Sequence, residues 1–403
     1  MTEGFYKNNT DKNKYSCLKC GLYKHSNYVP PYGGYKQRIL NLAEAPGFDE
    51  NEQQIPFVGK VGRILQRTYR RLGIDLFEDC LNVNSTSCRP VTTSGTNKKP
   101  TDKQIACCRE MVVKNVFEDY DPPDLIMLFG ASALKSFLGH RWGGTLKGIN
   151  RWRGWVIPDR ELNAWVAPVY HPSFIARSEE EIESLWIEDI QRALEHLDKP
   201  FPKYREPEIE FIEDLSPLYN IESNLTAFDY ETTGLKPQAQ GHRIVSCAIA
   251  DTPNHAYAFL IPKKRKDQKP LLWYLNNHEI GKVAANMSFE NNWSNVRLKQ
   301  SVKGWDMDTM LAAHVLDNRG GISSLDFQVY VQFGILGYDL KVKPYLKSPE
   351  DSGGNGFNKI HELLKTKQSI KDLLVYNAYD SIFELRIAWR QVKELNYDFL
   401  PEI

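Results

Sequence analysis

Short apolar runs alternate with longer amphipathic stretches through the first half of the chain, and the hydrophobic period changes at each boundary. Brief apolar runs bounded by turn residues are typical of buried strands, and apolar positions three and four apart are typical of helices. The strands are expected within RILNLAEAPG, DCLNVNSTSC, LIMLFG and NAWVAPVYH, and the helices at VGRILQRTYRRLGI, KQIACCREMVVKNVFEDY, ASALKSFLG and EEEIESLWIEDIQRALEHL. This alternation predicts a three-layer α/β sandwich around a parallel sheet.

The pattern breaks after residue 200, where prolines and dense charge replace the alternation. We expect a domain of residues 1–200, a linker of residues 201–222 with a short strand at IEFI, and a second domain of residues 223–403. In the second domain, apolar strands come first (within NLTAFDYETTG, RIVSCAIADT, HAYAFLI and KVAANMS) and helices follow. This order predicts a mixed-sheet α/β domain.

Composition limits the class of protein. Among 403 residues, 51 Lys and Arg balance 51 Asp and Glu, so the chain lacks the overall basic charge of many nucleic-acid binders. Such a balance still suits an enzyme with acidic metal ligands in one place and a basic groove in another. No run of about 18 apolar residues predicts a membrane span, and the first residues contain no signal peptide. A reducing cytoplasm is therefore the expected location.

Four cysteines from three segments are candidate metal ligands. Cys17 and Cys20 form a C-x-x-C pair, Cys88 lies in NSTSCRP, and either Cys107 or Cys108 supplies the fourth thiol. Four thiolates hold a tetrahedral zinc or an iron–sulfur cluster. The long gap and the split second pair argue against a zinc ribbon. Buried structural thiols or disulfides are the simpler alternatives.

Polar residues also follow the predicted strands, where parallel sheets bind ligands. Asn84 offers a donor and an acceptor together, which fits the edge of a uracil-like base. Phe57 is suited to stacking on such a base, and His171 to stabilising negative charge on its O2. The loop 43–62 supplies a Pro-Gly turn that brings backbone amides near a ligand. Taken singly, Glu44 of this loop suits a helix cap, Phe57 a core aromatic ring, and His171 a hydrogen-bonded structural histidine.

The ordered motifs C-x-x-C, E-A-P-G-x-D-E, P-F-V-G, N-x-x-x-C-R-P, L-x-G-A-x-A and H-P-S resemble the family 4 uracil-DNA glycosylases over about residues 15–195. The resemblance implies a [4Fe–4S] cluster on Cys17, Cys20, Cys88 and Cys108. It also implies a water-activating loop at Glu44, Ala45, Pro46 and Gly47, uracil stacking by Phe57, base reading by Asn84 and an O2 contact by His171. Two departures touch the pocket wall: Ala43 stands where the family has Gly, and the strand end reads N-S-T-S-C-R-P.

Carboxylates recur in the second half. Asp229 and Glu231 alternate along one strand and so share a face, and Tyr376 and Asp380 lie four apart on one helix face. Glu290, with Asn286 before it, completes a set of four carboxylates. Such a set holds two Mg²⁺ or Mn²⁺ ions, which activate water and stabilise a leaving 3′ oxygen. Tyr376 would orient the attacking water.

The strings D-x-E-T-T-G-L and Y-x-x-x-D resemble the DEDD 3′–5′ exonucleases of the Tyr subtype, the proofreading domain of family A DNA polymerases. The resemblance implies a ribonuclease H-like fold. Glu290 departs from the family, which has Asp after N-x-x-F/Y.

Together these patterns predict a bifunctional DNA-processing protein that excises uracil and removes 3′ nucleotides. The chain ends soon after the third exonuclease motif, so we expect no polymerase palm and a separately encoded DNA polymerase subunit as partner, an arrangement that suits a DNA phage. The first alternative is an exonuclease whose iron–sulfur domain only binds DNA or senses uracil. A second makes both domains structural accessories.

Overall fold

The computed structural model describes residues 15–349 and 355–395. The chain divides into two compact units, one of Met1–Pro202 with Tyr330–Ile335, the other of Lys203–Val329 with Leu336–Ile403. Among the described residues, no helix is long and apolar enough to cross a membrane.

The first unit is built on a five-stranded sheet in which four strands run parallel. The order is β2 (Cys80–Asn84), β1 (Ile39–Ala43), β3 (Leu125–Phe129), β5 (Ala164–Val169) and β4 (Ile157–Asp159). Every residue of β1, β2 and β3 is buried, as expected for strands covered on both faces. The edge strand β4 pairs antiparallel with β5, and the hydrophobic pattern did not predict it.

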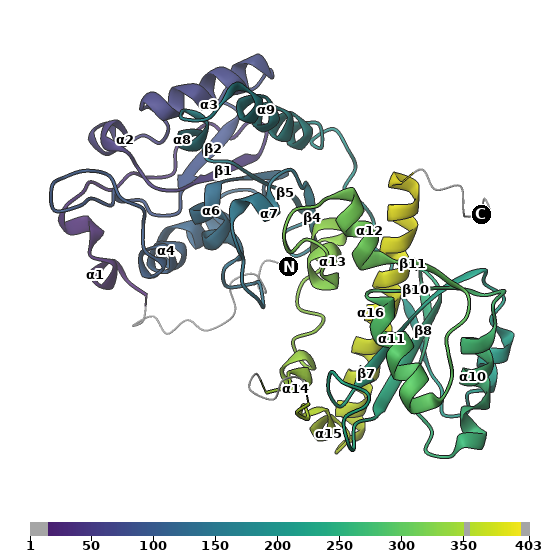
Figure 1. The fold of residues 1–403 in the computed structure, drawn as a ribbon. Coiled ribbons are helices and arrows are strands. Elements are labelled where there is room, and N and C mark those ends of the chain that lie inside the picture. Colours follow the sequence, from purple (N-terminus) through teal and green to yellow (C-terminus); the bar gives the residue numbers. More distant parts are fainter. Residues whose placement is uncertain (1–14, 350–354, 396–403) are drawn as a thin grey trace. The chain divides into compact units, whose positions relative to one another are not determined.

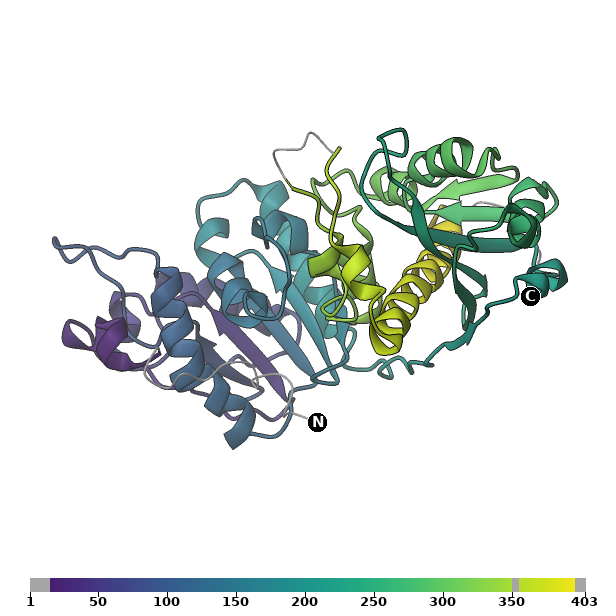
Figure 2. The ribbon, with the colours of Figure 1, turned by 90° about the horizontal axis from the view of Figure 1, so that it is seen from below.

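Helices cover both faces of this sheet (Figures 1 and 2). One layer holds α3 (Lys60–Arg71), α8 (Pro172–Ile175) and α9 (Glu180–Leu194), and the other holds α4 (Asp102–Cys108), α6 (Gly130–Leu138) and α7 (Ile149–Trp152). Leu65, Tyr69 and Trp186 fill the space between the first layer and the strands. The predicted three-layer α/β sandwich is confirmed.

Two local features differ from the pattern-based expectation. The single helix expected over 103–120 is interrupted after α4 by a π-helical turn, Arg109–Val113, before α5 (Lys114–Asp119). Tyr330–Ile335, from late in the chain, is grouped with the first unit, where the Tyr330 hydroxyl donates a hydrogen bond to Asp159 at 2.8 Å. A buried hydroxyl–carboxylate pair of this kind leaves no periodic signal in a sequence.

The second unit contains a six-stranded mixed sheet. Its order is β11 (Trp305–Asp308), β10 (Gly281–Ala284), β7 (Leu225–Thr232), β8 (Ile244–Thr252), β9 (His255–Leu260) and β6 (Glu208–Phe211). Strands β7, β8 and β9 are antiparallel neighbours, whereas β10 runs parallel to β7 and β11, and β6 runs parallel to β9. The short strand expected at IEFI is thus β6, an edge strand of this sheet, and the structure groups residues from Lys203 onward with the second unit.

Helix α16 (Lys367–Glu394) covers one face of this sheet, and α10 (Lys269–Asn276) and α11 (Met287–Trp293) cover the other (Figure 1). Alternate side chains of strand β7 point to opposite faces of the sheet. Phe228 and Tyr230 pack with the α10 and α11 side, while Ala227 packs against α16. The other described helices of this part of the chain are α12 (Thr309–Leu316), α13 (Leu325–Phe333), α14 (Lys343–Leu346) and α15 (Ile360–Leu363), and α13 is grouped with the first unit from Tyr330 onward. This architecture confirms the expected ribonuclease H-like mixed sheet.

Candidate active sites and a cysteine cluster

The four predicted cysteine ligands come from three elements of the first unit. Cys17 and Cys20 are the first and last residues of α1 (Cys17–Cys20), whose first turn is capped by Ser16. Gly21 ends this turn in the left-handed region at φ 76°. Cys88 follows β2 and pairs with Tyr28 through an antiparallel bridge, which draws the N-terminal segment onto the strand end.

Cys108, at the end of α4, lies next to Cys20. Its thiol donates a hydrogen bond to Cys20, which lowers the pKa of the Cys20 thiol to about 6. The Ser87 backbone amide donates to Cys108 Sγ at 3.4 Å. Burial and the nearby Cys20 and Cys17 raise the pKa of Cys88 to about 11. The four sulfurs therefore share one environment. Cys107, buried beside Cys108, makes neither of these two contacts.

The spacing of the sulfurs bears on which metal group they fit. A zinc ion with Zn–S bonds of about 2.3 Å would hold four sulfurs within about 4 Å of one another. Among the described residues, no three cysteine sulfurs lie within 4.8 Å of one another. Wider spacing fits a cluster, in which each thiolate binds a different iron. Cys17, Cys20, Cys88 and Cys108 would hold it.

The cysteine segment is also fastened to the loop after β1. Asn27 exchanges two hydrogen bonds with Asn51 of α2 (Phe48–Gln53): its backbone amide donates to Oδ1, and its side chain donates to the carbonyl, both at 2.9 Å. The segment after Cys17 and Cys20 is therefore hydrogen-bonded to the helix that directly follows the E-A-P-G motif.

Glu44 lies directly after β1, at the carboxyl end of the sheet. Its Oε2 accepts a hydrogen bond from the Ser132 hydroxyl of α6 at 3.0 Å, and its carbonyl accepts from the Thr86 amide at 3.3 Å. Ala45 and Pro46 then lead to Gly47, the N-cap of α2. Sequence patterns did not single out Ser132, because its partner is 88 residues away.

Phe57 adopts a left-handed backbone conformation with φ 60°, which is rare for a bulky residue. Its ring is 7% exposed and packs edge-on against Phe129, with ring centroids 6.1 Å apart. Gln66 donates to the Phe57 carbonyl at 2.7 Å, and a Cβ on Gly62 would lie only 2.0 Å from that oxygen. This conformation, which costs about 1–3 kcal/mol, is imposed by its neighbours, as is common where function fixes a ring.

Asn84 ends β2 opposite Ala43 of β1 and is 6% exposed. Within the described ranges, its side-chain amide makes no hydrogen bond, although a buried amide normally has partners. Its donor and acceptor are therefore available to a ligand.

His171 follows β5 and caps α8. The Ser173 backbone amide donates to its Nδ1 at 3.1 Å, so the proton of the neutral ring resides on Nε2. Burial, together with the Arg177 charge, lowers the pKa of His171 to about 4, which keeps the ring neutral at pH 7. Gly130, at φ 85° after β3, makes room for it, since a Cβ there would lie 2.9 Å from the His171 Cβ.

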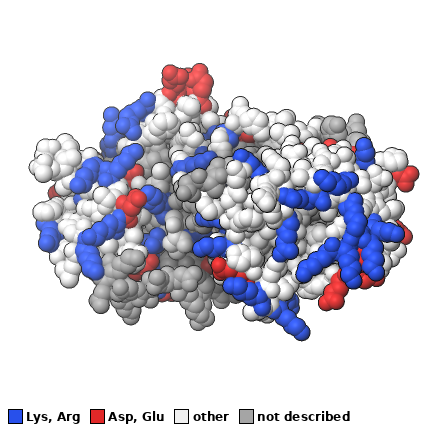
Figure 3. Space-filling view, turned by 60° about the horizontal axis from the view of Figure 1, so that its bottom comes forward, with Lys and Arg blue, Asp and Glu red and all other residues white. Residues whose placement is uncertain are grey.

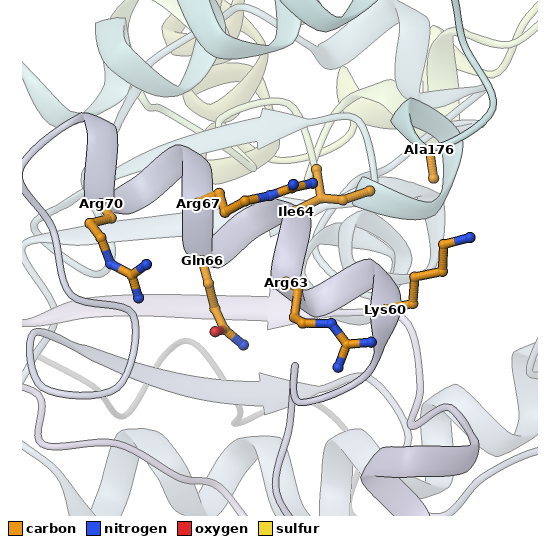
Figure 4. Close-up of a pocket in the computed structure, with 7 residues that line it drawn as sticks. All are labelled: Lys60, Arg63, Ile64, Gln66, Arg67, Arg70 and Ala176. Atoms are coloured by element: carbon orange, nitrogen blue, oxygen red, sulfur yellow. The ribbon is translucent and has the colours of Figure 1, made fainter.

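A basic hollow lies along α3, beside this sheet edge (Figure 4). Its volume is about 440 Å³, and Lys60, Arg63, Arg67 and Arg70 line it on one helix face, with Ala176 from the segment after α8. In the part of the chain that the structure describes, none of these four cations forms an ion pair. Figure 3 shows that Lys and Arg side chains also gather elsewhere on the drawn face, where Asp and Glu are sparse.

In the second unit, three carboxylates meet on the α16 face of the sheet. Oxygen atoms of Asp229 and Glu231 from β7 and of Asp380 from α16 all lie within 4.8 Å of one another. The predicted alternation and helix spacing thus bring these three groups together. Burial raises the pKa of Asp229 to about 7 and those of Glu231 and Asp380 well above their usual values. Such a set suits a divalent cation, which removes the cost of gathering like charges.

Neighbouring polar groups hold two of these carboxylates in place. Asn377 donates to Asp229 Oδ2 at 2.6 Å and accepts a hydrogen bond from the Ser246 hydroxyl at 2.9 Å. The Tyr338 hydroxyl donates to Asp380 Oδ1 at 2.8 Å. Sequence patterns identified neither Asn377 nor Tyr338. For Asn377, the helix spacing was an available signal, because this residue lies three positions before Asp380 and therefore on the same face of α16.

Tyr376, the predicted water-orienting residue, also donates a hydrogen bond to Asp380. Its ring stacks on Tyr338, with centroids 6.0 Å apart and an interplanar angle of 21°. The two tyrosines therefore flank the same carboxylate.

The second motif is placed differently. Glu290 of α11 is 2% exposed but does not join the group of three within 4.8 Å. Its pKa is raised by burial and by the Asp229 charge, so it lies near that residue. Asn286, at φ 74°, starts α11, and its backbone amide donates to Asp308 at 3.2 Å.

Comparison with known proteins identifies the first unit. Residues 30–196 match the uracil DNA glycosylase superfamily. The chain is 31% identical over 185 residues to the type-4 uracil-DNA glycosylase of Thermotoga maritima. The aligned region covers 45% of this chain and 90% of the relative. The chain is 32% identical over 166 residues to the type-4 uracil-DNA glycosylase of Archaeoglobus fulgidus, with 40% and 78% covered. Through its first unit, the chain belongs to the type-4 uracil-DNA glycosylases.

The second half is similar to nucleases and polymerases. It is 27% identical over 207 residues to DNA polymerase I of Chloroflexus aurantiacus, of which the chain spans 20%. Similar solved structures include Escherichia coli RNase D, an exoribonuclease (14% identity, TM-score 0.35, covering 48% of this chain and 46% of that chain). Another is Brucella melitensis NrnC with bound Mg²⁺ (17% identity, TM-score 0.34, covering 48% and 82%).

Proposed function

We propose that this protein excises uracil from DNA with its first unit and removes nucleotides from 3′ ends with its second. The observation that carries the first activity is the occurrence of a free Asn84 amide and a neutral, Nε2-protonated His171 at the carboxyl ends of β2 and β5, two parallel strands of the same sheet. These are the donors and acceptors that a uracil ring requires.

For uracil excision, the base leaves the DNA stack and enters the pocket. Phe57 stacks on the ring, Asn84 reads its edge, and His171 Nε2 donates to O2. The bond between the sugar C1′ and uracil N1 breaks, and its electron pair moves onto the base, where the His171 donor stabilises the charge. Water from the Glu44 to Gly47 loop adds at C1′ and gives up one proton, which passes to the departing uracil anion, so that the products are an abasic sugar and neutral uracil. Ser132 holds the Glu44 carboxylate during this step.

The basic hollow on α3 supports a path for the DNA backbone. Lys60 and Arg63 begin the helix, three to six residues after Phe57, and Arg67 and Arg70 continue the same face. Phosphate groups are the ligands that four unpaired cations in a row favour. We therefore assign the flanking DNA strand to this face.

For nucleotide removal, Asp229, Glu231 and Asp380 would hold a divalent cation. When bound, such ions polarise the scissile phosphate and activate water. Tyr376 and Tyr338 keep Asp380 in position, and Asn377 does the same for Asp229. Tyr376 orients the attacking water toward the phosphorus. Two Mg²⁺ or Mn²⁺ ions and a [4Fe–4S] cluster are the proposed cofactors. A proofreading or replication role beside a DNA polymerase subunit, in the cytoplasm, extends this proposal.

One experiment separates uracil excision from the alternative of DNA binding alone. The full chain carrying Asp229→Asn is incubated, without divalent metal, with 5′-labelled DNA containing uracil or thymine, and alkali reveals abasic sites. Alkali-labile sites at uracil alone support excision. Intact DNA, with the iron content of the protein unchanged, overturns it, and tighter binding of uracil DNA would then favour a sensing domain.

The second activity is tested on 3′-labelled DNA and RNA strands in Mg²⁺ or Mn²⁺. The unmodified chain should release labelled nucleotides from DNA, and Asp229→Asn should lower the rate by at least 10³-fold. Asp267→Asn, which changes an exposed carboxylate in the same unit, is the matched control. Equal rates for Asp229→Asn and the unmodified chain would show that the metal site is wrongly placed, and preference for RNA would change the substrate.

A further inference from the structure

Helix α16 carries a further buried carboxylate, Glu384, one turn beyond Asp380 and on the same helix face. Its side chain is 2% exposed. Oε1 accepts a hydrogen bond from the Ala285 backbone amide at 3.1 Å, at the end of β10. Oε2 is buried without a partner among the described residues.

Glu290 repeats this arrangement from the other side. It lies on α11, the helix that follows Ala285, and its Oε2 is likewise buried and unpartnered in the described part of the chain. Glu384 and Glu290 interact electrostatically with each other and with Asp229. Two unpartnered carboxylate oxygens, one from Glu290 and one from Glu384, thus lie near the candidate metal site. Neither residue belongs to the group of Asp229, Glu231 and Asp380.

An unpartnered carboxylate in a protein interior is costly unless a proton or a cation satisfies it. The glutamate at position 290 offers a reason for both unpartnered oxygens, that of Glu290 and that of Glu384. Glutamate, one methylene longer than the aspartate of the exonuclease motif, stands at this position, and its carboxylate does not join the Asp229, Glu231 and Asp380 group. A ligand from α16 beside this displaced carboxylate would complete a second cation position.

We propose that Glu384 is a fifth metal ligand of this site, so that Glu290 and Glu384 contribute their unpartnered oxygens to the second divalent cation while Asp229, Glu231 and Asp380 hold the first. This inference rests on the proposed exonuclease function and adds a residue to it. Glu384 thereby compensates for the aspartate-to-glutamate exchange at position 290.

Metal binding tests this without DNA or turnover. Mn²⁺ is titrated into the metal-depleted full chain, and bound ions are counted by electron paramagnetic resonance and calorimetry. The unmodified chain should bind two ions in the second unit. Glu384→Gln keeps an oxygen to accept from the Ala285 amide, so the fold is preserved, and it should weaken the second ion at least tenfold while leaving the first unchanged. Glu394→Gln, an exposed residue of the same helix, should bind like the unmodified chain.

The outcomes distinguish the two proposals. Two ions bound with unchanged affinity by Glu384→Gln would overturn the role of Glu384 and leave the exonuclease proposal intact, with Glu384 then a neutral buried acid. No Mn²⁺ bound by the unmodified chain would overturn the metal site itself. Restoration of the second ion by Glu384→Asp, with reduced affinity, would support a ligand role over a purely structural one.

Discussion

The backbone amide of Ser173 donates a hydrogen bond to Nδ1 of His171 at 3.1 Å, so the neutral ring keeps its proton on Nε2. The same geometry opposes protonation, because Nδ1 must remain an acceptor. Burial and Arg177 add to this and hold the pKa near 4. A neutral imidazole can then serve as a hydrogen-bond donor at physiological pH.

This relationship predicts a pH-dependent stability. The His171 pKa is about 4 in the folded chain and about 6.5 when unfolded, so the unfolded state binds more protons between these values. The stabilisation is complete above pH 6.5 and is lost as the pH falls toward 4. Between pH 7 and pH 5, the unmodified chain should lose about 2 kcal/mol of unfolding free energy relative to His171→Gln. Urea titrations at both pH values measure this, and parallel curves for the two proteins would contradict the assigned pKa.

Gly130→Ala should disable uracil excision selectively. The new Cβ would meet the His171 Cβ at 2.9 Å, and φ 85° disfavours any side chain. A displacement of about 1 Å at a positioning residue lowers rates on the order of 10²-fold. Excision should fall by that amount while 3′ nucleotide release is unchanged. Gly143→Ala, which faces open space, is the control. An unchanged rate of uracil excision by Gly130→Ala would show that the position of His171 does not matter for this activity.

Asn377→Ala should slow 3′ nucleotide release because Asp229 is no longer held in position, since the substitution changes no charge. Without its amide, Asp229 Oδ2 loses a 2.6 Å hydrogen bond, and the Ser246 hydroxyl loses its acceptor. We expect about a 10²-fold lower kcat for 3′ nucleotide release, with little change in KM, in single-turnover and steady-state assays. Asn377→Asp keeps an acceptor for Ser246 but adds a fourth carboxylate to the group. An unchanged kcat in Asn377→Ala would show that Asp229 does not need this support.

Cys108→Ser should lose the iron–sulfur cluster, whereas Cys107→Ser should keep it. Cys108 contacts Cys20 and accepts from the Ser87 amide, and adjacent Cys107 makes neither contact. Iron and acid-labile sulfide per chain, with the visible absorption of the purified protein, measure the outcome. Four irons per chain in Cys108→Ser would contradict the assignment of Cys108 as the fourth cluster ligand and favour Cys107.

Arg63→Gln and Arg67→Gln should each weaken DNA binding in a salt-dependent way. Removing one phosphate contact lowers the slope of log affinity against log salt concentration by about one. Fluorescence anisotropy with a uracil-containing strand at several salt concentrations gives this slope. Lys36→Gln changes a lysine already paired with Glu78 at 2.6 Å and should leave the slope unaltered. Equal slopes for all three variants would place the DNA elsewhere.

Periodicity predicted the main architecture because it reports burial, which is a property of single elements. The strands carrying Asn84 and Asp229 are examples, and motif spacing brought Asp229, Glu231 and Asp380 together correctly. What remained invisible depends on pairs distant in sequence. Ser132 supports Glu44 across 88 residues, and Tyr338 meets Asp380 across 42.

Some local features also escaped the pattern. The antiparallel strand β4 has only three residues, too few to show alternation. The short strand expected at IEFI does form, as β6, but the pattern did not show that it joins the sheet of the second unit. The π-helical turn after Cys108 leaves the hydrophobic pattern intact while breaking the regular helix. Each is a property of backbone pairing, which composition does not encode.

The alternation of β7 places aromatic residues and catalytic candidates on opposite faces of one strand. A slip of one residue against β8 would exchange them, burying Asp229 and Glu231 among aromatic rings and turning Phe228 and Tyr230 toward α16. A chain in the wrong register would therefore lose its core packing and its group of three carboxylates together. The register of β7 thus fixes both the core of the second unit and the position of its candidate metal ligands.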